Sequence, residues 1–408
     1  MRIHPFRAIR PAPELAERVA SVPYDVVSRS EAAELAQGNP YSFLHVGRSD
    51  IDLPQNVDAY DPLVYAQARR SLDQFLAGGT LLREPAASLY LYRQVMEGRA
   101  QVGVVGCVHI DDYEADVIRK HEKTRPDKED DRTRHVLTLN ANAEPVFLTY
   151  RGMPQIEALV EPILQMPPLY DFTAPDGVRH TVWRVPDSTP LIGAFRGVSH
   201  AYVADGHHRS ASAWRAGKEI RARPPQQRGD GEYNWFLAVL FPADQLRILP
   251  YNRVLRDLNG LSGAEVLARL AHVGRVWPTE DSSPPRPGTF CIYPTGGWYL
   301  LELDETSIDR DDPIGSLDVA LLQERVLGPI FGIEDPRTDK RIDFVGGIRG
   351  PKELERRVSS GEMAIAFSLY PTTLEQLMAV ADAGKVMPPK STWFEPKLCS
   401  GLFVHELG

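Results

Sequence analysis

The stretch Tyr202-Val-Ala-Asp-Gly-His-His-Arg-Ser-Ala-Ser-Ala-Trp214 constrains the fold of this chain more than any other segment. An apolar run typical of a strand stops at Asp205, Gly206 follows, and an alanine-rich run typical of a helix comes next. The first N–H groups of a helix have no partner within it, and the helix dipole favours negative charge there. The order of strand, glycine turn and helix therefore predicts an anion site.

The side chains around this turn suit a phosphate group. Gly206 lets the backbone approach an anion closely, and Arg209 is a bidentate donor for phosphate oxygens. His207 and His208 add further donors. A tight turn carrying surface histidines is the alternative, but the strand, the glycine and the basic helix start coincide here. We therefore interpret the segment as functional.

Composition limits the classes of function. The chain has 408 residues, of which 43% are hydrophobic and 25% charged, as in an ordinary soluble protein of two or three domains. Its formal net charge of -9 argues against binding nucleic acid by phosphate neutralisation. The three cysteines are far apart in sequence, and neither a secretory leader nor a membrane-spanning run is evident, so we expect a cytoplasmic protein without a membrane partner.

The pattern of elements predicts an α+β (mixed α/β) fold, because helices and strands interleave irregularly. We expect three regions, namely 1–150, 151–260 and 261–408. Hairpins are predicted over 89–109, around Asp176-Gly177 and over 290–303, and a buried strand over 235–241. Helices are predicted from a cap at Ser30 to Gln37, and over 62–76, 155–165, 263–272, 317–327, 352–359 and 373–383.

A second signal is the charged segment His121-Glu-Lys-Thr-Arg-Pro-Asp-Lys-Glu-Asp-Asp-Arg132. Most charge runs are solvated loops, and that interpretation stays open. Alternatively, Glu122 acts as a general base or binds Mg²⁺, while Lys123, Arg125 and Lys128 meet phosphates.

Two further segments combine rigid prolines with polar side chains. Met387-Pro-Pro-Lys-Ser-Thr-Trp-Phe-Glu-Pro-Lys397 presents cations and hydroxyls, namely Lys390, Ser391, Thr392 and Lys397. A proline-stiffened tail that packs its aromatic residues is compatible with that role. Val22-Pro-Tyr-Asp-Val26 makes Asp25 a candidate site residue, although a capping aspartate explains it equally well, and His45 is a further candidate.

The motifs PYDV, HEKT, ADGHHR and MPPKSTWFEPKL together, in order and over nearly the whole chain, resemble a prokaryotic family of unknown function, DUF1015. The ADGHHR segment also resembles the phosphate motif of the ParB/sulfiredoxin superfamily, which includes enzymes that phosphorylate free L-serine. This resemblance implies a ParB/sulfiredoxin-like nucleotide-binding core with additional helical and hairpin segments. It further implies a kinase that uses ATP or ADP with Mg²⁺ to phosphorylate a small hydroxyl compound, L-serine first.

The resemblance implies that Gly206, His207, His208 and Arg209 hold phosphates and that Glu122 activates the acceptor hydroxyl, and we assign the other candidate residues to the same predicted site. The catalytic group comprises Glu122, His208 and Asp205, and Mg²⁺ would be held by Glu122 and Asp205. The nucleotide would be bound by Gly206, His207, His208, Arg209, Ser210, Lys390 and Lys397. The acceptor would be bound by Asp25, His121, Thr124, Ser391 and Thr392. We expect ADGHHR, HEKT and the loop from Lys390 to Lys397 to converge on one cleft.

Two other functions remain open at this stage. A ParB-like nucleotide switch would use the same phosphate motif, although the chain shows no basic helix for DNA. A metal-dependent hydrolase would use His121, His207, His208 and Asp25 as ligands. The oligomeric state is not predicted by any of these motifs.

Overall fold

The computed structural model describes residues 1–223 and 231–408. The chain divides into two compact units. Unit 1 contains Met1–Leu246 together with the C-terminal segment Pro396–Gly408, and unit 2 contains Arg247–Glu395. The units therefore differ from the three predicted regions, because the boundary expected at residue 150 falls inside unit 1 and the chain returns to unit 1 at its end.

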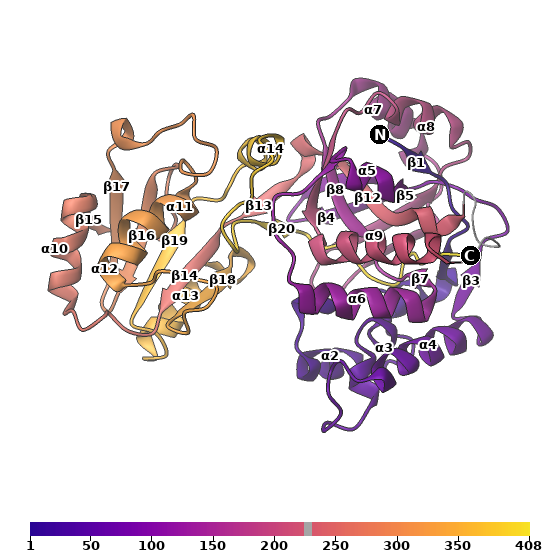
Figure 1. Cartoon of the computed structure of the whole chain (residues 1–408), viewed down its shortest axis with the longest axis horizontal. Coiled ribbons are helices and arrows are strands. Elements are labelled where there is room, and N and C mark those ends of the chain that lie inside the picture. The colour runs from indigo at the N-terminus through magenta and orange to yellow at the C-terminus, as the bar shows by residue number, and fades with distance from the viewer. Residues whose placement is uncertain (224–230) are drawn as a thin grey trace. The chain divides into compact units, whose positions relative to one another are not determined.

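Unit 1 is built on a large mixed sheet (Figure 1). Its strand order is β6-β11-β8-β12-β5-β4-β10-β9, and β1 pairs with β5. The pairs β6–β11 and β8–β12 are parallel, and the other pairs are antiparallel. The strands are β1 (Ile3–His4), β4 (Tyr90–Met96), β5 (Arg99–His109), β6 (Ile118–Arg119), β8 (Val146–Tyr150), β9 (Tyr170–Thr173), β10 (Arg179–Arg184), β11 (Ala201–Asp205) and β12 (Trp235–Pro242).

Unit 1 also contains helices. Helix α9 packs against β8 and β12 of the sheet, and α6 lies alongside α9 (Figure 1). Their bounds are α1 (Ala16–Val19), α2 (Arg29–Ala36), α3 (Leu44–Gly47), α4 (Pro62–Ala77), α5 (Ile110–Glu114), α6 (Pro126–Leu139), α7 (Pro154–Leu164), α8 (Thr189–Phe195) and α9 (His207–Arg221). The mixed α/β fold class predicted from the sequence is confirmed. So is the strand over 235–241, whose residues are buried almost without interruption.

The C-terminal segment is threaded into unit 1 by backbone pairing. Ser400 pairs with Ser21 and Val404 with Ile9, and β21 (His405–Glu406) pairs with β7 (Ala141–Asn142). A further small pair joins β2 (Ile9–Pro11) to β3 (Leu81–Arg83). Because the segment begins at residue 396, this pairing places Lys397 in the same unit as the ADGHHR turn.

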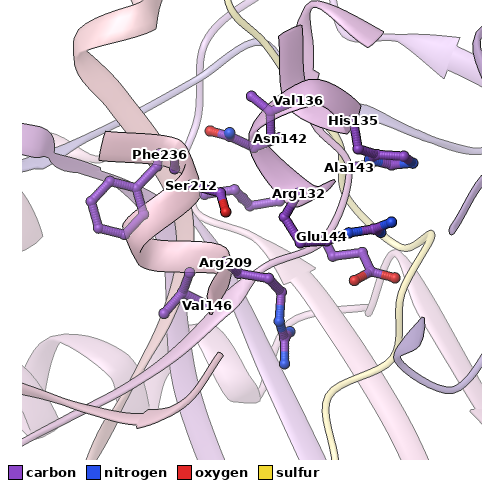
Figure 2. A pocket seen from close by; sticks show the side chains of 12 residues that line it. Arg132, His135, Val136, Asn142, Ala143, Glu144, Val146, Arg209, Ser212 and Phe236 are labelled. Carbon is purple, nitrogen blue, oxygen red and sulfur yellow. The ribbon is translucent and has the colours of Figure 1, made fainter. Parts of the chain in front are cut away.

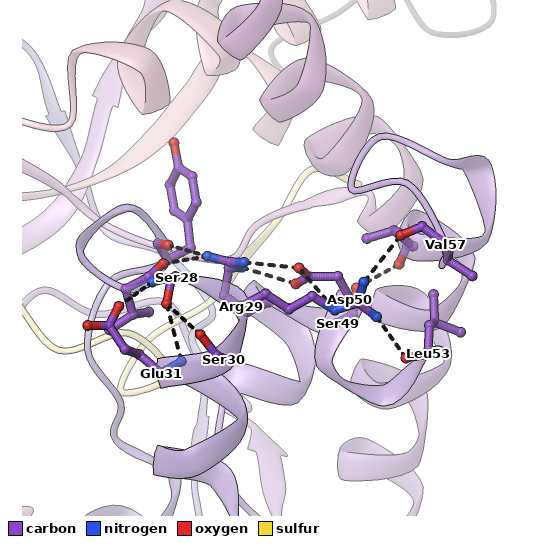
Figure 3. Close-up of polar contacts among 12 residues, drawn as sticks. Ser28, Arg29, Ser30, Glu31, Ser49, Asp50, Leu53 and Val57 are labelled. Atoms are coloured by element: carbon purple, nitrogen blue, oxygen red, sulfur yellow. Dashed lines mark hydrogen bonds and ion pairs between the residues drawn. The ribbon is translucent and has the colours of Figure 1, made fainter. Parts of the chain in front are cut away.

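The N-terminal part of unit 1 is held by arginine contacts (Figure 3). Helix α2 is capped by Ser28, whose side chain accepts from the Glu31 N–H while Glu31 accepts from the Ser28 N–H. The predicted cap at Ser30 is therefore wrong by two residues, because Ser28, not Ser30, stands three residues before a glutamate. Arg48 binds Asp50 through two nitrogens and also donates to the carbonyl of Tyr24, which fixes the turn before α2.

Unit 2 contains an antiparallel sheet in the order β15-β17-β16-β19-β14-β18. Its strands are β14 (Tyr251–Leu255), β15 (Gly274–Thr279), β16 (Thr289–Pro294), β17 (Trp298–Leu303), β18 (Ile342–Gly346) and β19 (Ile365–Leu369). A separate pair joins β13 (Arg247–Leu249) to β20 (Trp393–Glu395). The helices are α10 (Gly263–Val273), α11 (Asp318–Leu322), a π-helical turn (Gln323–Leu327), α12 (Gly328–Phe331), α13 (Gly350–Ser359) and α14 (Leu374–Asp382).

Candidate functional site

The predicted strand–turn–helix is present in unit 1 and forms the centre of the site. Strand β11 ends at Asp205, and Gly206 at the N-cap of α9 has φ +89° and ψ 36°. This left-handed conformation favours glycine. A Cβ on Gly206 would also lie only 3.0 Å from Nε of Arg209. Both the backbone conformation and the space around it therefore disfavour a side chain at this position.

The start of α9 is open to an acceptor. No side chain caps it, and its first turn carries no acidic residue. The N–H groups of this first turn have no partner inside the helix, so a ligand oxygen can accept from them. Ser210, predicted to bind the cofactor, is instead fully buried and donates its hydroxyl to the carbonyl of Gly206. It therefore supports the turn from inside.

Arg209 is buried and ties three segments together. Its Nη1 donates to the carbonyl of Pro145 at 2.6 Å, and its Nη2 donates to Oδ2 of Asp205 at 2.8 Å. The same Nη2 lies 3.8 Å from Oδ2 of Asp25. Both terminal nitrogens are thus engaged, and only Nε has no partner among the described residues. The guanidinium can therefore offer a ligand its positive charge and the Nε–H donor, but not the pair of terminal nitrogens that a bidentate contact needs.

Asp205 lies between two cations. Lys397 Nζ is 3.2 Å from its Oδ1, opposite the bond from Arg209 to Oδ2. Burial opposes the charge of this carboxyl, but Lys397 and Arg209 outweigh that effect and lower its pKa well below the usual range. Asp205 is therefore ionised. Its contact with Lys397 brings the C-terminal end of the MPPKSTWFEPKL motif to the ADGHHR turn.

Two buried histidines at this turn have ring nitrogens without a hydrogen-bond partner among the described residues. The rings of His121 and His207 are perpendicular, with centroids 4.5 Å apart. Both nitrogens of His121 and Nε2 of His207 have no partner in the part of the chain that the structure describes. Burial lowers the pKa of His207 to about 4 and that of His121 still further from its usual value, so both rings are neutral at pH 7. Buried polar atoms without partners are rare, and each costs about 1–3 kcal/mol unless water or a ligand satisfies it.

His208 connects the HEKT segment to α9. Its Nε2 accepts from the N–H of Arg125 at 3.1 Å. Burial lowers its pKa, and the carboxylates of Glu122 and Asp25 oppose that shift, so both lie within electrostatic range of the ring. Glu122 is exposed, whereas Thr124 donates its hydroxyl to Glu129 in the first turn of α6. The predicted approach of HEKT to ADGHHR is therefore present in unit 1.

A small cavity lies behind the turn (Figure 2). Arg132, His135, Glu144 and Arg209 line it together with apolar side chains, and its volume is about 30 Å³. That is enough for one or two water molecules and too small for a nucleotide. Burial raises the pKa of Glu144, although Arg209 and Arg132 oppose the shift, and Ser400 donates a hydrogen bond to its Oε1 at 3.0 Å.

Arg132 and Glu144 were not among the predicted site residues. Arg132 ends the charged segment that begins at His121, and Glu144 lies twelve residues beyond it, so only Arg132 was marked by the charge pattern. His45 does not join the site through its hydrogen bonds, since its ring contacts Asp52 and the carbonyl of Asn39.

The remaining predicted residues belong to unit 2. Ser391 donates its hydroxyl to the carbonyl of Pro388, and its own carbonyl accepts from Thr372. Lys390 has φ 57°, and Thr392 is half-buried. These contacts fix the loop within unit 2, whereas Lys397 belongs to unit 1.

Neither a multi-ligand metal cluster nor a membrane span is found in residues 1–223 and 231–408. No three His, Cys, Asp or Glu side chains are grouped there so as to hold a metal ion. None of the helices in the same ranges has the length and apolarity that crossing a bilayer requires.

Residues 3–320 match the family model described as a protein of unknown function, DUF1015. The chain is therefore a member of the DUF1015 family, as its motifs predicted. No curated protein sequence matches it.

Three solved structures illustrate the similarity in fold. A free serine kinase in complex with AMP is 14% identical, with 72% of this chain and 86% of that chain covered and a TM-score of 0.35. A conserved hypothetical protein from Pyrococcus furiosus is 15% identical over 74% and 95%, with a TM-score of 0.36. SbnI with a C-terminal truncation, from Staphylococcus aureus, is 13% identical over 74% and 87%, with a TM-score of 0.39. No functional argument rests on these low values.

The turn at Gly206 provides a first prediction. Gly206→Ala should lower the free energy of unfolding in urea by more than Gly177→Ala does. Gly177 has a similar φ of +84° but open space around its Cβ position, so it reports the backbone cost alone, about 1–2 kcal/mol. The added Cβ at position 206 must also displace Arg209. Equal losses in the two variants would contradict the close packing of this turn.

His135 provides a pH-dependent prediction. Burial, with a smaller effect of Arg132, lowers its folded pKa to about 3, against about 6.5 in the unfolded chain. Between these values the unfolded chain binds more protons, so stability falls as the pH is lowered from 6.5. His135→Gln, which can still donate to the Val46 carbonyl, should reduce this slope by up to about 1.4 kcal/mol per pH unit. Urea unfolding at pH 7 and pH 5 measures it, and an unchanged slope would refute the assignment.

Proposed function

We propose that this protein is a kinase that binds ATP or ADP at the start of α9 and transfers a phosphoryl group to a hydroxyl of a small molecule. L-serine is the leading acceptor. One observation carries the proposal. An uncapped helix N-terminus opens at a left-handed glycine, and unpartnered buried nitrogens of His121, His207 and Arg209 surround it. Such nitrogens are expected where a ligand completes the hydrogen bonding.

Phosphate oxygens fit this set of donors. The amide N–H groups of the first turn of α9 are directed out of the helix end, and the helix dipole favours an anion there. Nε of Arg209 adds a charged donor, and neutral His207 adds one N–H in a suitable tautomer. Neutral histidines bind phosphate without adding charge, so the cationic contribution comes from Arg209 and Lys397.

Mg²⁺ fits the carboxylates at this site. Magnesium prefers oxygen ligands and uses one or two carboxylates together with the phosphates of its nucleotide. Asp205 is ionised, and Glu122 presents an exposed carboxylate near His208, so these two are the proposed ligands. When bound, the ion would neutralise charge on the transferring phosphoryl group.

The acceptor would approach from the exposed side of His208. Glu122 lies there and is the proposed base for the acceptor hydroxyl. Asp25 is also exposed and lies 3.8 Å from Arg209, and we propose its carboxylate as the partner of the ammonium group of an amino acid such as serine. Thr124 is proposed only as a support, because its hydroxyl is bonded to Glu129.

A nucleotide-binding regulatory switch is the second candidate, because the same helix start would serve it. The two functions differ in phosphoryl transfer alone.

Purified protein incubated with ATP or ADP, Mg²⁺ and a panel of hydroxyl compounds should form a phosphate monoester, detected by phosphorus NMR. Tight nucleotide binding with no ester formed from any acceptor would favour the switch and refute the kinase.

Glu122→Gln should separate catalysis from binding. The amide keeps the shape of the side chain and removes the base, so turnover should fall about 10²–10⁴-fold while the affinity for nucleotide measured without Mg²⁺ is nearly unchanged. Glu219→Gln is the matched control, because Glu219 is an exposed glutamate at the far end of α9. Wild-type turnover in the Glu122 variant would contradict a catalytic role for HEKT and would indicate that it is a solvated charged segment.

Arg209→Ala should weaken nucleotide binding. Loss of a buried charged donor costs about 1.5–3 kcal/mol, which is one to two decades in affinity. Arg215→Ala is the control on the same helix, since Arg215 pairs with Glu129 and Asp130. Calorimetric titration of folded protein, verified by circular dichroism, gives the comparison. An affinity equal to that of the wild type would exclude Arg209 from the phosphate site.

A further inference from the structure

Unit 2 contains a buried arginine that has no acidic partner. Arg253 on β14 is only 4% exposed. Its Nη1 donates to the carbonyl of Tyr251, and its Nη2 donates to the carbonyl of Pro389 at 3.4 Å. Within residues 247–395, all of which the structure describes, no carboxylate pairs with it. Burial consequently lowers its pKa to about 9. An unpaired buried charge is costly, so a protein retains one where it has a use.

A second cation belongs to the segment that Arg253 contacts. Lys390 follows Pro389, the residue whose carbonyl Arg253 reaches, and its side chain is exposed. Its Nζ is 5.4 Å from the centroid of the Tyr251 ring, and no ion pair with a carboxylate involves it in unit 2. Its φ of 57° is a conformation that a residue with a Cβ adopts only at a cost. Hydrogen bonds from Ser391 and Thr372 hold the turn that presents it.

A purely structural role accounts for part of this arrangement. Arg253 joins two backbone carbonyls, and its Cζ lies 5.3 Å from the centroid of the Phe344 ring. Those bonds use two of the five N–H donors of a guanidinium. A shorter neutral donor would serve the same carbonyls without burying a charge. The structural role also leaves the second unpaired cation, in a strained turn, without an explanation.

We propose that Arg253 and Lys390 form a second anion site, in unit 2, which binds the phosphate group of a small phosphate monoester. A phosphate monoester carries nearly two negative charges at pH 7, which matches two cations without a carboxylate better than a monocarboxylate does. The planar guanidinium supplies directed donors, and the ammonium supplies a mobile charge. Tyr251 and Trp393, edge to face at 5.3 Å, form an apolar wall beside it.

The test uses the full chain and inorganic phosphate as the probe, at constant ionic strength. Lys390→Ala should weaken phosphate binding about tenfold, as expected for loss of one charged contact. Lys385→Ala, an exposed lysine of the preceding segment, is the matched control and should bind as the wild type does. Arg253→Lys keeps a charge but loses the planar donors, so it should also bind more weakly. Acetate, a monoanion, should bind more weakly than phosphate. Calorimetry reports each affinity.

The same measurements separate this site from the nucleotide site. In Arg209→Ala the Lys390-dependent phosphate binding should persist, whether or not nucleotide binding is lost. Nucleotide affinity should be unchanged in Lys390→Ala. Equal phosphate affinity in the wild type and Lys390→Ala would overturn the proposal. So would an equal loss in Lys390→Ala and Lys385→Ala, because that result would indicate general surface charge.

Discussion

The structure around the Gly206 turn of unit 1 depends on the contacts of the Arg209 guanidinium. It is buried, it binds the carbonyl before β8 and the carboxylate that ends β11, and it lies against Gly206. These contacts join two neighbouring strands of the sheet to the first turn of the helix that follows them. A buried cation of this kind is stable only with its anionic partner in place, so Asp205 and Arg209 must be held together. The start of α9 is therefore rigid before any ligand arrives.

The C-terminal segment supplies the second cation that pairs with Asp205. Lys397 reaches Asp205 from a segment that the chain delivers only after unit 2 is complete. Gln94 on β4 binds the carbonyl of Lys397, which fixes the approach of this residue. The ADGHHR turn thus receives a lysine from a position almost two hundred residues away. Correct formation of the site requires folding of the whole of unit 1, including its last residues.

Local patterns predicted much of the fold and the centre of the site. Helix α9 after Gly206 and strand β12 follow directly from glycine placement and apolar runs. The prediction misplaced the cap of α2, although the capping-box spacing fits Ser28, which has Glu31 three residues later, and does not fit Ser30, which has Ala33 there. The perpendicular His121–His207 pair and the burial of Glu144 arise from long-range packing, which has no signature in local periodicity.

The charges of the site constrain the form in which a nucleotide can bind. Arg132, Arg209 and Lys397 contribute positive charge, and the carboxylates of Asp25, Asp131 and Asp205 oppose it. The two buried histidines add none, because burial keeps them neutral. The cluster is therefore close to balanced, and the several negative charges of a free ATP would find little net attraction. A nucleotide that carries its own divalent cation reduces this excess, and the cation can share Asp205 with the phosphates. If the proposed nucleotide site is correct, these charges would favour a magnesium–nucleotide complex over the nucleotide alone.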